Sequence, residues 1–293
     1  MKKVSIGTRI FQIFNALVLT ILALLCLLPL LNIVALSFSN SVAAASGQVT
    51  FWPVNFTLGS YEYVLEQKAF WRAFLVSVER IIVGGGLSIF LTMLSAYPLS
   101  KSNKTFRMRT FYVWYFFITM LFNGGLIPTY LVVTMVGIKN TIWALALPGA
   151  INVGNILLML NFFRQLPNEL EEAACIDGAG VFKTWFFIYL PCSVPSIATI
   201  TLFTMVAHWN SWFDGLIYMT KTEMYPLQSY LQTIVTRLDF QNMTVEELKR
   251  LAELNQRSLI SAQMVIAMVP ILLLYPFLQK HFASGIVLGS VKG

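Results

Sequence analysis

The most distinctive group of ionisable side chains lies in a short segment between two apolar stretches, and it holds four acids: Glu169, Glu171, Glu172 and Asp177. Pro167 and Asn168 predict the start of a helix there, and acids in its first turn suit the positive end of the helix dipole. Asp177-Gly178 predicts its end, because glycine tolerates the positive φ of a sharp turn. A second amphipathic piece, Val181–Leu190, follows. The pattern predicts a helix–turn–helix knob over residues 163–190, whose acids indicate a docking surface for another protein.

Residue patterns of common enzyme sites are missing from the sequence. It has no Gly-x-x-x-x-Gly-Lys-Ser/Thr phosphate loop, so we do not expect this chain to hydrolyse ATP by that route. His208 and His281 are its only histidines and cannot form a His-Glu-x-x-His metal site. Three scattered cysteines, Cys26, Cys175 and Cys192, fit neither a disulfide framework nor zinc spacing. We therefore expect no enzyme, no catalytic residue and no metal.

The elements that position the knob are predicted to cross a membrane. Hydrophobic residues make up 57% of the 293 residues and charged residues only 11%, against about 25% charged in an average soluble domain. No Asp, Glu, Lys or Arg occurs between Ile10 and Tyr61, and five more charge-free runs reach the length of about 20 residues that a spanning helix needs. The sequence therefore predicts an all-α polytopic membrane protein. The net charge of +7 is spread among loops, so we expect no nucleic-acid binding.

Six transmembrane helices fit this pattern in one membrane domain, residues 1–293. The expected spans are about 13–36, 71–99, 111–136, 141–162, 191–218 and 258–282. The N-terminus and the loop around Lys101–Arg109 carry seven basic residues, while the first loop on the other side carries two. Because basic loops stay on the cytoplasmic side, both termini and the knob are expected there. On the opposite side, Thr244 and Glu247 form a capping box that predicts a helix from Glu246 to about Asn255.

The second expected span has two unusual features. Glu79 and Arg80 are ionisable groups near its outer end, where an arginine can reach the interface; a structural role is favoured over an ion path. Small residues recur every fourth position, which puts them on one helix face: Gly84, Ser88, Thr92 and Ala96. Packing within the chain is favoured over a subunit interface for this face. The run Gly84–Gly86 is expected to loosen the helix.

The knob sequence resembles the EAA loop of ABC-importer permeases. The resemblance rests on Glu172-Ala173-Ala174, on Asp177-Gly178-Ala179 two residues later, and on Ile188-Tyr-Leu-Pro191. The stretches FTMVAHWNSWFDGLIY, PLQSYLQ and GIVLGSVKG are also similar to those of the carbohydrate-uptake subfamily that includes maltose-type permeases. Cys175 departs from the family, which more often has a polar or basic residue there.

The resemblance implies a type I ABC importer permease fold in a bacterial plasma membrane. By the resemblance, the knob inserts into a cytoplasmic ATPase subunit and converts ATP-driven closure into movement of the membrane helices. The implied coupling residues are Glu171, Glu172, Ala173, Ala174, Asp177, Gly178, Ala179 and Gly180. The implied partners are a second homologous permease, two ATPase subunits, an extracytoplasmic solute-binding protein and an oligosaccharide substrate. No cofactor is expected on this chain, with ATP and Mg on the partner ATPase. A hairpin that only packs beneath the spans is the alternative.

Candidate substrate-pathway residues are polar or aromatic groups midway along two expected spans: Asn152, Asn155, His208, Trp209, Asn210 and Trp212. Asparagine side chains bond sugar hydroxyls and aromatic faces stack on sugar rings, but helix–helix hydrogen bonding and ordinary packing explain the same residues. A secondary transporter or channel acting without an ATPase is the main functional rival. The knob and the scarcity of intramembrane charge disfavour it. A structural assembly subunit is the third class, if the knob binds something else.

Overall fold

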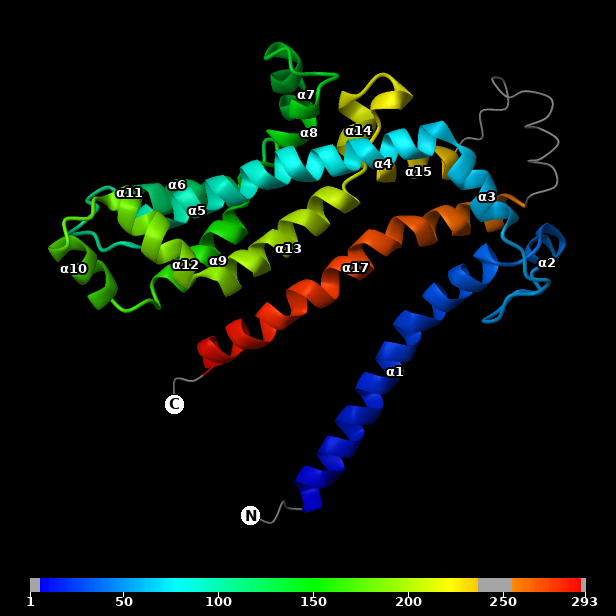
Figure 1. The fold of residues 1–293 in the computed structure, drawn as a ribbon, viewed down its shortest axis with the longest axis horizontal. Helices are drawn as coiled ribbons and strands as arrows, with labels where there is room; N and C mark the ends of the chain where they lie inside the picture. The colour runs from blue at the N-terminus through cyan, green and yellow to red at the C-terminus, as the bar shows by residue number, and fades with distance from the viewer. Residues whose placement is uncertain (1–5, 237–254, 291–293) are drawn as a thin grey trace. The chain divides into compact units, whose positions relative to one another are not determined.

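The computed structural model describes residues 6–236 and 255–290, and most of these residues are helical (Figure 1). Within the described ranges the only strand-like pairing is an isolated antiparallel bridge between Ser39 and Phe56. The chain divides into two compact units, residues 1–68 with 233–269, and residues 69–232 with 270–293. The expected capping box at Thr244–Glu247 and the helix after it lie outside the described residues, apart from Asn255.

The first unit is built on the long apolar helix α1 (Ile6–Ser37). It also contains α2 (Ser41–Ala45), α3 (Gly59–Glu66) and the first half of α17 (Gln256–Ser290). The Ser258 hydroxyl lies 2.9 Å from the carbonyl oxygens of both Leu36 and Ser39, and so anchors the start of α17 at the end of α1. Most large side chains of α1 are exposed, as expected of a helix that faces lipid.

The second unit is organised around one continuous helix of 33 residues. It is formed by α4 (Lys68–Arg80), the π-helical segment η1 (Ile81–Gly85) and α5 (Gly86–Ser100). The wider π turn coincides with Gly84 and Gly85, where the sequence predicts a loosened helix. Such single π turns are rare and concentrate at functional sites.

Besides the second half of α17, the remaining helices of the second unit are mostly short, several are separated by sharp breaks, and the last of them, α15, runs into the first unit. In chain order they are α6 (Arg109–Leu121), α7 (Leu126–Met135), α8 (Ile142–Ala146), α9 (Val153–Phe163), α10 (Glu169–Ile176), α11 (Val181–Thr184), η2 (Trp185–Tyr189), α12 (Leu190–Cys192), α13 (Val194–Asn210), α14 (Phe213–Tyr218), η3 (Thr222–Met224) and α15 (Leu227–Thr236). Helices α9 and α13 pack against the long helix (Figure 1).

The small-residue face of the long helix packs inside the chain. Ser88, Thr92 and Ala96 are at most 2% exposed, and Gly84 is buried against Ala146 and His208. This is the packing alternative that the sequence favoured. Close approach at these positions lets α9 and α13 reach the backbone of the long helix, and Tyr97, Met159 and Ile200 join the core that results.

Three described helices are long and apolar enough to cross a membrane, and two bent pairs raise this number to at most five. Helices α6 and α7 are bent by 112°, and the segment Val181–Cys192 meets α13 at 82°. The expected span 111–136 is therefore bent within its length. The 82° bend lies where the second piece of the knob meets the expected span 191–218, and that span is interrupted later, between α13 and α14. The expected span 141–162 is also interrupted, between α8 and α9, where Pro148 and Gly149 disfavour a continuous helix. At the first bend, Gly125 has a φ of 88° that only glycine adopts easily.

Candidate functional site

The expected helix–turn–helix of residues 163–190 is present as α10, the turn that follows it, and the second helical piece α11–η2. Helix α10 begins at Glu169, one residue after Asn168, as the sequence predicts. The Asn168 side chain makes no capping bond, and its backbone carbonyl accepts from the amides of Glu171 and Glu172, each at 3.0 Å. Asn168 itself has helical backbone angles, which orient its carbonyl rather than its side chain toward the first turn.

Gly178 ends α10 with the positive φ that the sequence predicts, 71°. The Gly178 amide donates to the carbonyl of Cys175 at 3.1 Å, and the Ala179 amide donates to that of Ala174 at 2.8 Å. These two bonds form a Schellman cap, which satisfies carbonyls that a helix end otherwise leaves unpaired. Asp177 is the C-cap residue and stays exposed. The turn therefore fixes the direction of the chain as it leaves α10.

The outer surface of the knob combines acidic and large apolar side chains. Glu172, Ala173 and Asp177 are exposed, as is Gly180. Beside them, Ile176 is 87% exposed, Phe182 74% and Val181 69%. Exposed apolar groups gathered with charges on a small projection are typical of a protein-binding surface. Ala174 is instead buried and Ala179 half-buried, so these two support the turn from within.

Glu171 points to the inner side of the knob, where it meets Lys101 and Tyr189. The Lys101 ammonium donates to Glu171 Oε2 at 2.7 Å and to the Tyr189 hydroxyl at 2.9 Å. The Tyr189 hydroxyl donates to the same carboxylate oxygen at 3.0 Å. We call these three residues the clasp. Burial lowers the pKa of the Lys101 ammonium, and the carboxylate of Glu171 opposes this by stabilising the charged form.

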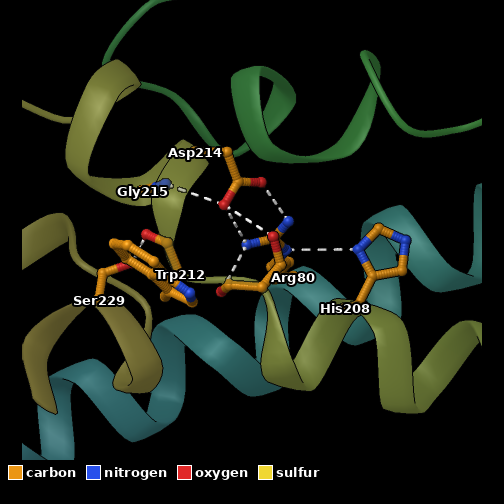
Figure 2. Close-up of polar contacts among 7 residues, drawn as sticks. Arg80, His208, Trp212, Asp214, Gly215 and Ser229 are labelled. Carbon is orange, nitrogen blue, oxygen red and sulfur yellow. Dashed lines mark hydrogen bonds and ion pairs between the residues drawn. The ribbon is translucent and has the colours of Figure 1, made fainter. Parts of the chain in front are cut away.

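A second polar cluster surrounds Arg80, the last residue of α4, directly before the π-helical segment of the long helix (Figure 2). The Arg80 side chain is 4% exposed and forms a bidentate ion pair with Asp214, which lies in the first turn of α14. Its guanidinium also donates to Nδ1 of His208 and to the carbonyl of Ser211, each at 3.3 Å. Planar, two-pronged arginine–carboxylate pairs hold their partners in a fixed orientation. Arg80 thus fixes the break between α13 and α14 to the long helix.

Further hydrogen bonds make the same break rigid. Asp214 Oδ1 accepts from the Ser211 hydroxyl and from the Gly215 amide, both at 2.9 Å. The Ser229 hydroxyl donates to the carbonyl of Trp212 at 2.6 Å (Figure 2). Gly215 permits this packing, because a Cβ there would lie 2.2 Å from Ser229 Oγ. Asp214 therefore holds both the turn between α13 and α14 and the side chain of Arg80 in place.

The candidate substrate-pathway residues divide into a buried and an exposed set. Asn155, His208 and Trp209 are buried with protein partners: Asn155 Nδ2 donates to Thr204 Oγ1 at 3.3 Å, and Trp209 meets Phe74 edge to face. These contacts match the packing explanation. The exposed set is Asn152, which caps α9 by accepting from the amide of Asn155, together with Asn210 and Trp212. The structure does not gather the six around one described cavity.

Sequence reasoning missed the Arg80–Asp214 pair. The position of Arg80 near the outer end of its span suggests that it reaches the interface, but it is buried at 3% exposure because its partner is a protein carboxylate. Asp214 was not singled out, although it is the only acid in the expected span 191–218. That single carboxylate was the available signal of a partner for an intramembrane arginine. Among the residues that the structure describes, no three His, Cys, Asp or Glu side chains gather as metal ligands.

Long apolar helices, bent helix pairs and a buried ion pair between helices define a helical, multi-pass membrane protein. Residues 80–287 match the binding-protein-dependent transport system inner membrane component family, and the chain belongs to that family of transport permease subunits. It is 38% identical over 285 residues to the polygalacturonan/rhamnogalacturonan transport system permease protein YtcP of Bacillus subtilis, covering 97% of this chain and 99% of that protein. Protein LplC of the same organism is 41% identical, covering 97% and 96%.

Solved structures give the same answer for the fold. A chain from the crystal structure of a bacterial ABC transporter involved in the import of the acidic polysaccharide alginate superposes with a TM-score of 0.86. The two sequences are 31% identical, and the match covers 96% of this chain and 100% of the other. The chain is therefore a permease subunit of the ABC-importer type and a transport protein rather than an enzyme.

Proposed function

We propose that this chain is one of two homologous permease subunits in a complex that imports an oligosaccharide. The other partners are two cytoplasmic ATPase subunits and an extracytoplasmic solute-binding protein. Two similarities support a carbohydrate substrate: the relative named for polygalacturonan and rhamnogalacturonan transport, and the solved transporter that imports alginate. ATP and Mg bind the ATPases in this proposal, and this chain supplies the path through the membrane.

The observation that carries the proposal is the outer surface of the knob. It presents Glu172 and Asp177 beside Ile176 and Phe182, all exposed, on a turn whose backbone is fixed by Gly178. A rigid projection with both charge and apolar surface suits insertion into a groove of a partner protein. We therefore assign it as the EAA coupling loop, with Glu172, Ala173, Asp177, Gly178 and Gly180 facing or shaping the ATPase contact, while Ala174 and Ala179 hold the turn.

The proposed topology has six membrane crossings. The three long helices provide three of them, each of the two bent pairs provides one, and the α8–α9 region provides the sixth. Both termini and the knob lie on the cytoplasmic side. Single cysteines at Ser102 and Thr222, both exposed, test this in a background without Cys26, Cys175 and Cys192. An impermeant maleimide applied to intact cells should label position 222 and spare position 102. Labelling of both from outside would contradict the topology.

The proposed substrate path runs along the exposed set Asn152, Asn210 and Trp212. Their side chains leave hydrogen-bonding groups and an aromatic face available, whereas Asn155, His208 and Trp209 are engaged inside the protein. Alanine at Asn210 or Trp212 should reduce uptake without reducing the yield of assembled complex. Equal loss of yield and uptake would assign these residues to packing instead.

Copurification combined with uptake tests the proposed function directly. The detergent-solubilised chain should bring down an ATPase, and reconstituted complexes should accumulate an acidic or neutral oligosaccharide only with ATP and loaded binding protein. Glu172→Lys and Gly178→Val should weaken ATPase capture or abolish uptake, because they reverse a surface charge and strain the turn by about 1–3 kcal/mol. Gly137→Val is the matched control, since Gly137 has a similar φ of 78° outside the knob.

Uptake that persists without any ATPase would support the rival, a secondary transporter or channel. Capture of a protein that does not hydrolyse ATP would support a structural subunit. Unchanged uptake by Glu172→Lys and Gly178→Val, with an ATPase bound, would show that the knob is not the coupling element.

A further inference from the structure

The inner side of the knob holds a lysine in an unusually enclosed position. Lys101 directly follows α5, and its side chain is only 11% exposed. Its ammonium lies 4.1 Å from the ring centre of Tyr97 and 4.0 Å from that of Tyr189, in addition to its bonds with Glu171 and the Tyr189 hydroxyl. Aromatic faces attract cations more strongly when water is excluded. The lysine is thus held from several sides by elements distant in sequence.

An ordinary surface ion pair contributes little because water competes for both partners, whereas here the aromatic rings shield the ammonium and only the carboxylate is in part exposed. Here the ammonium joins three elements: α5 through its backbone, α10 through Glu171, and η2 through Tyr189. Tyr97, Phe163 and Tyr189 pack against one another beneath it, with ring centres 4.8 to 6.2 Å apart. The knob is therefore joined to the end of α5 by an enclosed ammonium over an aromatic base, while the Glu171 side chain stays 36% exposed.

The same continuous helix carries the second polar anchor. Arg80 lies 21 residues before Lys101, which corresponds to about 30 Å along the helix at about 1.5 Å per residue. At that distant position the Arg80–Asp214 pair fixes the α13–α14 break, beside Asn210 and Trp212. One helix thus ends in the clasp on the knob and is bound, far from it, to the segment that carries candidate substrate contacts.

We propose that the clasp makes the knob and the α4–η1–α5 helix move as one body, so that a displacement of the knob is delivered to the Arg80–Asp214 anchor and the α13–α14 break. This inference rests on the proposed function, because it requires an ATPase that moves the knob. Glu171 then belongs to the inner linkage rather than to the ATPase contact surface. Lys101, Glu171 and Tyr189 are positioning residues for transport.

Reconstituted complete complexes test the inference with Lys101→Met, Glu171→Gln and Tyr189→Phe. ATPase copurification and basal ATP hydrolysis should stay near wild type, because the outer face of the knob is untouched. Uptake should fall by about 10-fold to 100-fold for Lys101→Met, within the range of ordinary coupling between distant sites, and loaded binding protein should no longer stimulate hydrolysis. Tyr189→Phe should have the smallest effect, because it removes only the hydroxyl. The charge exchange Lys101→Glu/Glu171→Lys should recover part of the uptake lost in the single variants.

Matched controls come from the same two segments. Lys104→Met removes an exposed lysine near the end of α5, and Glu169→Gln removes an exposed acid of α10. Both should transport like wild type. Wild-type uptake by Lys101→Met would overturn the inference, and so would loss of ATPase capture by Glu171→Gln, which would place Glu171 on the docking surface.

Spin labels separate a broken linkage from a protein that folds poorly. A label on the exposed Cys175 reports on α10, and one at Ile82→Cys, 68% exposed in the wild type, reports on the far part of the long helix. With wild-type Lys101, ATP should change both spectra. In Lys101→Met, ATP should change only the spectrum at position 175. Changes at both positions in that variant would refute the linkage. Failure of wild type to capture any ATPase would instead refute the proposed function.

Discussion

Breaking the Arg80–Asp214 pair should have unequal consequences, depending on which partner is removed. The Arg80 side chain is 4% exposed and that of Asp214 is 25% exposed. Asp214→Asn leaves a guanidinium almost without water or counter-charge, and loss of one partner of a buried pair costs about 3–5 kcal/mol. Arg80→Met leaves a partly hydrated carboxylate that still accepts from Ser211 and Gly215, so we expect about 1–3 kcal/mol.

Thermal unfolding of the detergent-purified complex measures this difference, as loss of the monodisperse peak in size-exclusion chromatography after heating. At about 2 °C per kcal/mol for a chain of this size, Asp214→Asn should melt about 6–10 °C below wild type and Arg80→Met about 2–6 °C below. The double variant Arg80→Met/Asp214→Asn should be more stable than Asp214→Asn alone, because it leaves no buried charge unpaired.

The neighbouring residue Glu79 provides the control, because it is exposed and adjacent to Arg80. Glu79→Gln should melt like wild type. The reasoning fails if Arg80→Met melts below Asp214→Asn, or if the double variant shows the full sum of the two single losses. Either result would mean that burial of the guanidinium does not determine how much stability is lost when the ion pair is broken.

Three further predictions follow from individual contacts. Gly84→Ala should lower the melting temperature, because the added Cβ would lie 2.9 Å from His208 Cε1 and 3.3 Å from the Ala146 backbone. Gly86→Ala should not, because no atom lies within 4 Å of a Cβ at that position. Equal melting temperatures of the two variants would contradict this. Asn155→Ala should reduce the yield of assembled complex, because it removes the buried hydrogen bond to Thr204. Asn152→Ala should remove only a helix cap, which contributes about 1 kcal/mol. A larger loss of yield for Asn152→Ala would show that Asn152, not Asn155, is the structural residue. Because burial lowers the pKa of Lys101, the clasp should lose its charge and uptake should decline at a lower alkaline pH in wild type than in Lys101→Arg, which stays protonated. The folded protein binds the Lys101 proton more weakly than the unfolded chain, so deprotonation of Lys101 at rising pH does not lower the stability of the fold. We therefore expect uptake to decline while the melting temperature stays unchanged. Identical pH profiles of uptake in wild type and Lys101→Arg would exclude Lys101 as the cause of the decline.

Local signals allowed the knob to be predicted closely. A helix that begins after Pro167 and ends at Gly178 depends on backbone preferences and charge–dipole interactions within a few residues. The structure has that helix at Glu169–Ile176 and the positive φ at Gly178. The Gly84–Gly86 run likewise predicted the loosened region that is a π turn in the structure. In each case the residues that cause the feature lie within about one helical turn of it, so the local sequence is enough to predict it.

The bends could not be predicted from hydrophobic length. The stretches 111–136 and 191–218 are apolar enough to cross a membrane, and length arguments treat each as one straight helix. The structure bends the first between α6 and α7 and interrupts the second between α13 and α14, because angles between helices depend on tertiary packing as well as on local chain preferences. Asn123-Gly124-Gly125 was a usable local signal at the first bend: the Asn123 side chain accepts from the Gly125 amide at 2.8 Å, and Gly125 has a positive φ.

The long-range partner of Arg80 required a different kind of argument, which the sequence does support. An arginine within a membrane span is costly unless another group compensates it, and only a few acids are available inside the expected spans. Glu79 is adjacent to Arg80 and points elsewhere on the helix, which leaves Asp214 as the acid of span 191–218. Pairing the two would have predicted a contact across 134 residues, and with it the packing of the α13–α14 break against the long helix. Intramembrane charges therefore constrain the arrangement of helices that apolar length alone leaves undetermined.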